Sequence, residues 1–166
     1  MTVILQKENR VLREKTEEIR DFGSAKLKLL IKKMSDAMFG EPDGIGIAAP
    51  QIGISKKIFL IAEDVLYPER LLDDKKKTKK YLVFINLVLK NKSSKKLKDM
   101  EGCLSVRGTY GDVARPEKIT VEYFDELGNK KIRGTSGLFS RVIQHEMDHL
   151  DGILFTDKAK NIKHIL

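Results

Sequence analysis

The chain has 166 residues, of which 41% are hydrophobic, and this length and apolar content suit a single globular domain over residues 1–166. The formal net charge of +8 favours anionic neighbours such as nucleic acid or a ribosome surface, but it says nothing about the fold. Cys103 is the only cysteine, which excludes an intramolecular disulfide, and neither a signal peptide nor a membrane span is visible. These features predict a soluble, cytoplasmic protein.

The first predicted element is an amphipathic helix over residues 24–39. Apolar residues recur there at three-to-four spacing, Ser24 can cap the start of the helix, and Gly40 can end it. The glycine-punctuated segment EPDGIGIAAPQIGI at residues 41–54 then predicts a tight loop that leads into a strand.

Short apolar runs at residues 57–61 and 81–89 predict two strands. Two lysine-rich segments, at residues 75–80 and 90–98, show no strand pattern, and we expect both to be solvated surface loops. Neither segment predicts a specific nucleic-acid site.

An alternating segment at residues 118–125, the turn residues 127–129 and the following KKIRG predict a β-hairpin. A second helix is expected from residue 136 to residue 150. The order of one helix, several strands and a late helix predicts an α+β fold, because strands and helices do not alternate as a parallel sheet requires.

The strongest chemical signal is QHEMDH at residues 144–149, in the second predicted helix. His145 and His149 are four residues apart, so their side chains project from one face of a helix and can bind one metal ion. Glu146 is adjacent in sequence to the first histidine and can reach a water molecule on that ion without being a ligand.

The helical phase strengthens this hypothesis. Leu138, Val142, His145 and His149 follow one another at steps of four, three and four, so both histidines continue a stripe that should face the core. Two buried neutral imidazoles need polar partners, and a shared metal ion satisfies both. The alternative is a pair of core histidines with other hydrogen-bond partners.

A metal site of this kind needs a third protein ligand and leaves one position open. Candidates are His164, several carboxylates and Cys103, which lies in the segment EGCLSV. A lone cysteine is more often a small buried hydrophobe than a ligand, and sequence spacing leaves the choice open.

Three segments together resemble the signature motifs of the peptide deformylases: GIGIAAPQ at residues 44–51, EGCLS at 101–105 and QHEMDH at 144–149. They occur in the order of that family, and the resemblance extends over nearly the whole chain. It implies mainly antiparallel strands around a late metal-binding helix. It also implies hydrolytic removal of the formyl group from the N-terminal formylmethionine of newly synthesised polypeptides, with release of formate.

The resemblance assigns one divalent metal ion to Cys103, His145 and His149. In this family the ion is usually Fe2+, although Zn2+, Ni2+ or Co2+ can take its place. A thiolate with two imidazoles would by itself favour zinc.

The resemblance also implies catalytic roles. Glu146 would take a proton from the attacking water and pass it to the departing amine. The side-chain amide of Gln51 and the backbone N–H of Leu104 would stabilise the developing oxyanion.

The substrate site implied by the resemblance begins at Gly44, Ile45 and Gly46, along which an extended substrate would bind. Ile45, Leu138 and Val142 would line a pocket for its methionine side chain.

Glu101 and Arg115 resemble a pair that supports the site from behind. Two departures from the family pattern affect the rim and one strand: Arg107 stands where a proline is usual, and Leu87 replaces the proline of an INP sequence. They put substrate preference in doubt but leave the chemistry untouched.

Such substrates would bring the protein into transient contact with the ribosome, but the 17 residues after His149 leave little length for a long C-terminal docking helix. Two other functions stay open at this point. One is a zinc endopeptidase of the HExxH class, which would need no EGCLS motif. The other is a basic RNA-binding module, which the low aromatic content of 7% disfavours.

Overall fold

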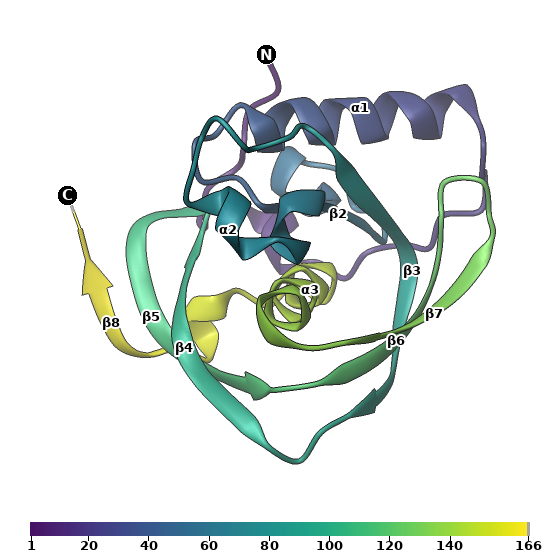
Figure 1. Cartoon of the computed structure of the whole chain (residues 1–166). Coiled ribbons are helices and arrows are strands. Elements are labelled where there is room, and N and C mark those ends of the chain that lie inside the picture. The colour runs from purple at the N-terminus through teal and green to yellow at the C-terminus, as the bar shows by residue number, and fades with distance from the viewer. Residues whose placement is uncertain (166) are drawn as a thin grey trace.

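The computed structural model describes residues 1–165, in which two antiparallel sheets curve around a central helix (Figure 1). The strands are β1 Gly46–Ala48, β2 Ile58–Ala62, β3 Tyr81–Lys92, β4 Lys96–Cys103, β5 Val106–Pro116, β6 Ile119–Phe124, β7 Lys130–Thr135 and β8 Lys160–His164. The α-helices are α1 Ala25–Phe39, α2 Pro68–Leu71 and α3 Gly137–Leu150, and short 3-10 helices cover Arg10–Arg13, Ala49–Ile52, Glu63–Leu66 and Phe155–Asp157.

The larger sheet has the order β1-β2-β3-β6-β7 and the smaller sheet the order β4-β5-β8, with every neighbouring pair antiparallel. Helix α3 packs against strands of both sheets, and α1 covers the larger sheet from outside. The predicted α+β class is therefore confirmed. No helix among the described residues is both long and apolar enough to cross a membrane.

Helix α1 forms where the sequence predicted it. The Ser24 hydroxyl accepts a hydrogen bond from the Leu27 N–H at 3.0 Å, which satisfies one of the unpaired donors of the first turn. Leu27, Met34 and Met38 are buried on the face that packs on the larger sheet, and Gly40 caps the end of the helix.

The predicted hairpin is also confirmed, as β6 and β7. The Asp125 side chain accepts hydrogen bonds from the backbone N–H groups of Leu127 and Asn129. Gly128 has a φ of +87°, a left-handed conformation that glycine adopts without a steric penalty. This local chemistry closes the turn, and the Gly23 N–H adds a hydrogen bond to the Glu126 carbonyl at 2.8 Å.

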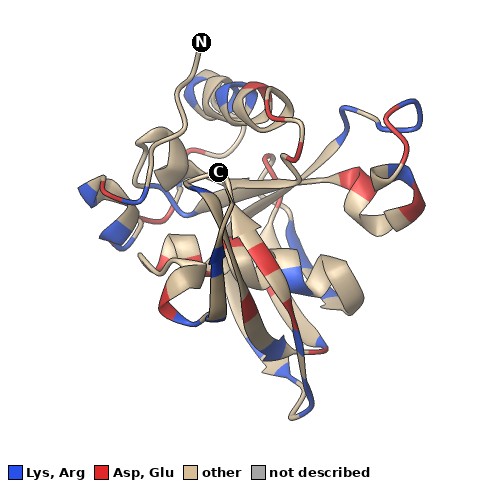
Figure 2. Ribbon diagram, turned by 90° about the vertical axis from the view of Figure 1, so that its left-hand side faces the viewer, with Lys and Arg blue, Asp and Glu red and all other residues tan. Residues whose placement is uncertain are grey.

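One expectation was wrong. Residues 90–98 do not form a loop, because β3 continues to Lys92 and β4 begins at Lys96. Backbone pairing to β6 and β5 extends this ribbon, whose side chains are mostly exposed, as expected. Figure 2 shows basic residues, in blue, at the tip of this ribbon. Lysines are tolerated in strands whose side chains face water, so the lysine content of this segment led to a wrong prediction of its backbone conformation. Residues 75–80 do form the exposed loop that was predicted.

Candidate metal centre and substrate cleft

Cys103, His145 and His149 meet between the end of β4 and α3, although 42 residues or more separate the cysteine from the histidines. Their ligand atoms all lie within 4.8 Å of one another, and Cys103 Sγ is 3.3 Å from His149 Nε2. One ion at about 2.0–2.3 Å from each donor fits such a group, and a thiolate with two imidazoles is a common donor set for divalent metals.

The β4–β5 hairpin brings Cys103 to the helix. The register of the two strands shifts between Glu101 and Cys103, and the Ser105 N–H points to Cys103 Sγ at 3.4 Å. Gly102 is required in this bulge, because a Cβ atom there would lie 2.7 Å from the ring of Tyr110. The EGCLS motif therefore encodes a distorted strand end as well as a sulfur ligand.

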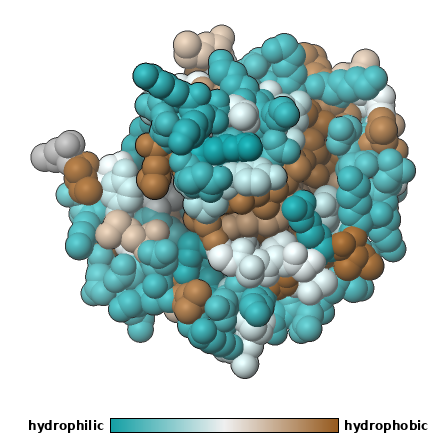
Figure 3. Space-filling view, in the orientation of Figure 1, coloured by the Kyte–Doolittle hydropathy of each residue, from teal (hydrophilic) through white to brown (hydrophobic). Residues whose placement is uncertain are grey.

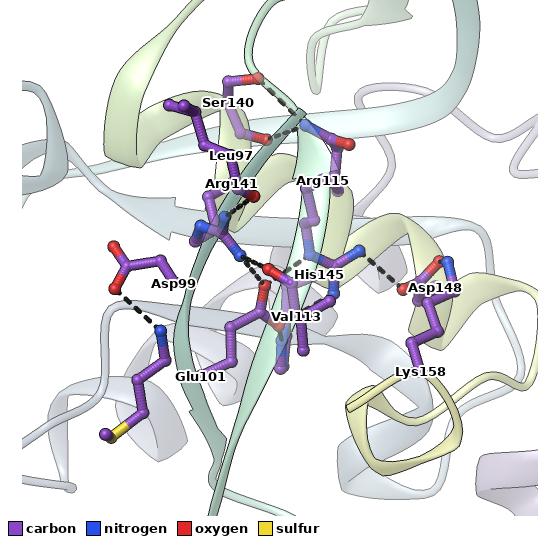
Figure 4. Close-up of polar contacts among 12 residues, drawn as sticks. Leu97, Asp99, Glu101, Val113, Arg115, Ser140, Arg141, His145, Asp148 and Lys158 are labelled. Carbon is purple, nitrogen blue, oxygen red and sulfur yellow. Dashed lines mark hydrogen bonds and ion pairs between the residues drawn. The ribbon is translucent and has the colours of Figure 1, made fainter. Parts of the chain in front are cut away.

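Glu101 holds His145 from behind. Its Oε2 atom is 2.9 Å from His145 Nδ1, and it also accepts a hydrogen bond from Arg115 Nη2 at 2.9 Å (Figure 4). Burial alone would raise the pKa of Glu101, but hydrogen bonds from Arg115 and His145 hold that pKa well below its usual range. With Nδ1 engaged, His145 has only Nε2 left for a metal ion.

The two histidines differ in ionisation. Burial lowers the pKa of His149 well below its usual value, so this ring is neutral at neutral pH. Burial also opposes charge on His145, but hydrogen bonds to Cys103 and Glu101 raise the pKa of His145 well above its usual value. A metal ion binds the neutral imidazole, so metal binding at His145 competes with the proton that these hydrogen bonds favour.

Glu146 is buried beside the same group, with a relative exposure of 3%. Its Oε2 atom has no hydrogen-bond partner within residues 1–165, and burial raises the pKa of Glu146 to about 7. A Cβ atom at position 46 would lie 2.5 Å from Glu146 Oε1, so Gly46 makes room for this carboxyl group. Such an unpartnered, poised carboxyl group is typical of a general base.

Gln51 reaches the centre from the 3-10 helix that follows β1. Its Oε1 atom accepts a hydrogen bond from the Ala48 N–H at 2.8 Å, which fixes the orientation of the amide. Its Nε2 atom consequently donates to Ser105 Oγ at 3.1 Å and lies 3.7 Å from Cys103 Sγ. Leu104 occupies the turn beside it, with a relative exposure of 8%.

A cleft of about 360 Å³ opens over this centre. Ile45 and Gly46 line one side, Leu138 and Val142 line its floor on α3, and Glu146 lies at its base. In Figure 3 hydrophobic side chains gather in a hollow near the middle of the face, within a hydrophilic surround. The sequence places Leu138 in a core-facing stripe, but Leu138 is 36% exposed and belongs to the cleft.

Of the five residues predicted to bind the substrate, Gly44 does not line this cleft. It lies in the tight turn after α1, where its N–H donates to the Glu41 carbonyl at 3.1 Å and a Cβ atom would overlap the Met38 carbonyl. Gly44 thus shapes the segment that leads to β1.

Comparison with known proteins decides the family, because the polypeptide deformylase family matches residues 1–164 of this chain. The chain belongs to that family. A peptide deformylase of Picosynechococcus sp. is 40% identical over 153 residues, which cover 92% of this chain and 76% of that relative.

Solved structures agree. A probable peptide deformylase from Synechococcus phage S-SSM7 is 37% identical with a TM-score of 0.83, covering 95% of this chain and 99% of that one. The peptide deformylase of Synechococcus elongatus, solved in complex with actinonin, is 36% identical with a TM-score of 0.82, covering 95% of this chain and 78% of that one.

As a family member the chain is a metal-dependent hydrolase that removes the formyl group from the N-terminal formylmethionine of new polypeptides. The endopeptidase and RNA-binding hypotheses are set aside by this membership. Two departures from the family pattern have clear positions: Leu87 is buried in the core, and Arg107 lies on the rim of the cleft.

Sequence reasoning missed several residues of the enzyme's centre. Arg141 donates to Glu101 Oε1 at 2.8 Å, and Asp148 accepts a hydrogen bond from Arg115 at 2.9 Å. Arg141 precedes His145 by four residues, so the helical spacing that paired the histidines also placed Arg141 on their face. Ser105, within EGCLS, was not singled out although it binds Gln51.

Proposed function

We propose that Cys103, His145 and His149 bind one divalent ion in this enzyme and that Glu146 carries the proton of the deformylation reaction. One observation carries the proposal: three converging ligand atoms lie directly beside a buried carboxyl group that has an unpartnered oxygen. When bound, a divalent ion polarises a carbonyl group and makes water a stronger acid. We propose Fe2+ as the native ion, with Zn2+, Ni2+ or Co2+ as substitutes that the same donors accept.

Glu146 accepts a proton from the water that attacks the formyl carbon. It then donates this proton to the nitrogen as the carbon–nitrogen bond breaks, which yields formate and a free N-terminal amine. Burial raises the pKa of Glu146 to about 7 in the metal-free protein, which supports a role for this carboxyl group in both accepting and returning a proton.

The oxygen of the formyl group becomes negatively charged during the attack. We assign its stabilisation to the Nε2 amide of Gln51 and the backbone N–H of Leu104. Support comes from the bond between Ala48 and Gln51 Oε1, which presents the donor end of the amide to the centre. A preorganised donor needs no reorientation when charge develops.

The substrate is proposed to add as an extended strand along the free edge of β1, which is an outer strand of the larger sheet. Gly46 permits close approach of the substrate backbone, and Ile45, Leu138 and Val142 form the pocket for the methionine side chain. Gly44 supports this edge through its turn.

We also propose that residues 1–166 form one catalytic domain, and that the enzyme acts in the cytoplasm with transient ribosome contact. The support for the last two points is the nature of the substrate, which emerges from ribosomes, together with the net charge of +8.

The central experiment measures formate release from formyl-Met-Ala-Ser by anaerobically purified protein, together with its metal content. We expect turnover by wild-type protein, none of the acetyl-Met-Ala-Ser control, and loss of both metal and turnover in Cys103→Ala. Reconstitution of metal-free protein with each of the four ions ranks them. Retention of metal by Cys103→Ala would refute the ligand assignment.

A further inference from the structure

An exposed ion pair joins Arg107, which lines the cleft, to Glu41, which lies two residues before the cleft-lining Asp43. Nη1 and Nη2 of Arg107 donate to the two carboxylate oxygens of Glu41, at 3.1 and 2.8 Å. Arg107 is on β5 and lines the cleft, whereas Glu41 lies in the turn between α1 and β1. The pair therefore ties together two segments that are 66 residues apart.

Both partners have anchored backbones. The Glu41 N–H donates to the Met38 carbonyl at 3.2 Å, and the Glu41 carbonyl accepts from Gly44. The Arg107 N–H donates to Gln6 Oε1 at 3.4 Å. A bidentate guanidinium–carboxylate pair between fixed backbones specifies a distance, because its two parallel bonds tolerate little displacement.

A second junction lies at the buried side of the same cleft, where Gln51 Nε2 donates to Ser105 Oγ at 3.1 Å. Gln51 follows β1 and Ser105 precedes β5, so this bond links the same two segments, which we call the walls of the cleft. The buried junction belongs to the catalytic centre. Arg107 and Glu41 take no part in the proton or charge transfers assigned there.

We propose that the Arg107–Glu41 pair is a clasp that fixes the separation of the walls and so sets the affinity for the substrate chain beyond its methionine. This inference rests on the proposed addition of the substrate along β1. A strand binds more tightly between walls already at the right spacing, because less ordering is needed on binding.

The test compares a substrate that reaches past methionine, formyl-Met-Ala-Ser, with one that ends there, formyl-methionine amide. In Arg107→Gln and in Glu41→Gln, we expect KM for the longer substrate to rise about two- to fivefold, the range of a partly exposed ion pair. We expect kcat, metal content and KM for the short substrate to stay unchanged. The charge swap Glu41→Arg/Arg107→Glu should return KM to near the wild-type value.

Arg13→Gln is the matched control. It breaks another bidentate pair, Arg13–Asp157, which is similarly exposed but does not line the cleft. The clasp is overturned if the single variants behave like Arg13→Gln, if KM rises equally for both substrates, or if the swap is no better than the single changes. Absence of wild-type turnover would overturn the proposed function and the clasp with it, whereas normal turnover with unchanged KM overturns the clasp alone.

Discussion

Two buried glutamates adjoin His145 in opposite electrostatic surroundings. Glu101 receives hydrogen bonds from Arg115, Arg141 and His145, and those from Arg115 and His145 outweigh burial to keep the pKa of Glu101 well below its usual range. Glu146 is at least as buried, but one of its oxygens has no partner among residues 1–165, and burial raises the pKa of Glu146 to about 7. The pKa values of the two buried carboxyl groups therefore move in opposite directions, because hydrogen-bond donors offset burial at Glu101 and do not at Glu146.

The difference separates positioning from proton transfer. The lowered pKa of Glu101 keeps this carboxylate ionised near neutral pH, so it can orient His145 there. Glu146 can hold or release a proton near neutral pH, which a fully hydrogen-bonded carboxylate cannot do. Four changes test this contrast.

The largest effect is expected for Glu146→Gln. Glutamine keeps the size of the side chain but cannot carry a proton, so kcat should fall by about 10²–10⁴. Metal content should stay at the wild-type level, because Cys103, His145 and His149 are unchanged. Glu69→Gln, on the exposed face of α2, is the control and should leave kcat unaltered. Full turnover by Glu146→Gln would remove Glu146 from the mechanism.

Arg115→Met tests the hydrogen-bonded glutamate, Glu101. It removes the side chain that donates to both Glu101 and Asp148 inside the protein. Removing one member of a buried ion pair leaves the other charged and desolvated, so the free energy of unfolding should fall by about 3–5 kcal/mol in urea titrations. Arg20→Met, at an exposed position, should change it by less than about 0.5 kcal/mol. A loss under about 1 kcal/mol for Arg115→Met would mean that Arg141 and His145 suffice for Glu101.

In the metal-free protein, Glu146 and Glu101 should contribute to the pH dependence of the free energy of unfolding with opposite signs. The folded pKa of Glu146 lies above its ordinary 4.5, so its stabilising contribution is complete below pH 4.5 and is lost as the pH rises to about 7. A shift of this size corresponds to roughly 3 kcal/mol. Glu101 has a lowered pKa, so its contribution is complete above pH 4.5 and is lost on acidification.

Unfolding free energies measured with chelator from pH 4 to 8 check both signs. Glu146→Gln should be more stable than wild type at pH 8, and the difference should vanish near pH 4. Glu101→Gln should be less stable than wild type across this range, with the deficit shrinking at its acidic end. A constant difference between wild type and Glu146→Gln would contradict the raised pKa.

Much of the fold was predictable because its signals are local. Helix α1 carries its own cap and apolar stripe, and β6 and β7 are closed by turn residues. The strands of the smaller sheet were not visible, because β4 is rich in lysine and β8 is exposed along its whole length. Their extended state comes from pairing with β5, which no local pattern encodes.

The site residues likewise divide into those with a local signal in the sequence and those brought in by the tertiary structure. Helical spacing alone placed His145 and His149 on one face, since both lie on α3. The approach of Cys103 depends on a shift in the register of β4 and β5, so only the resemblance pointed to it. The structure shows that Cys103, His145 and His149 lie close together, and their roles as metal ligands stay predictions. Asp148 was missed because its partner Arg115 lies on another element, 33 residues away.

The smallest effect is expected at the outer end of the network behind Glu101. Lys158 donates to Asp148 at 2.9 Å, but its side chain is 44% exposed, against 4% for Arg115. Solvent screens such a pair, so Lys158→Gln should lower the free energy of unfolding by no more than about 1 kcal/mol and leave metal content unchanged.

Lys56→Gln is the matched control for Lys158→Gln, because the Lys56–Glu17 pair is similarly exposed at the lysine but stands apart from the network. Equal small losses in the free energy of unfolding of the two variants would show that Lys158 does not contribute to the stabilisation of Glu101, which then depends on Arg115 and not on residues beyond it. A loss in Lys158→Gln as large as in Arg115→Met would instead mean that Glu101, Arg115, Asp148 and Lys158 act as one cooperative unit, because only coupling through Asp148 could carry a surface change to Glu101.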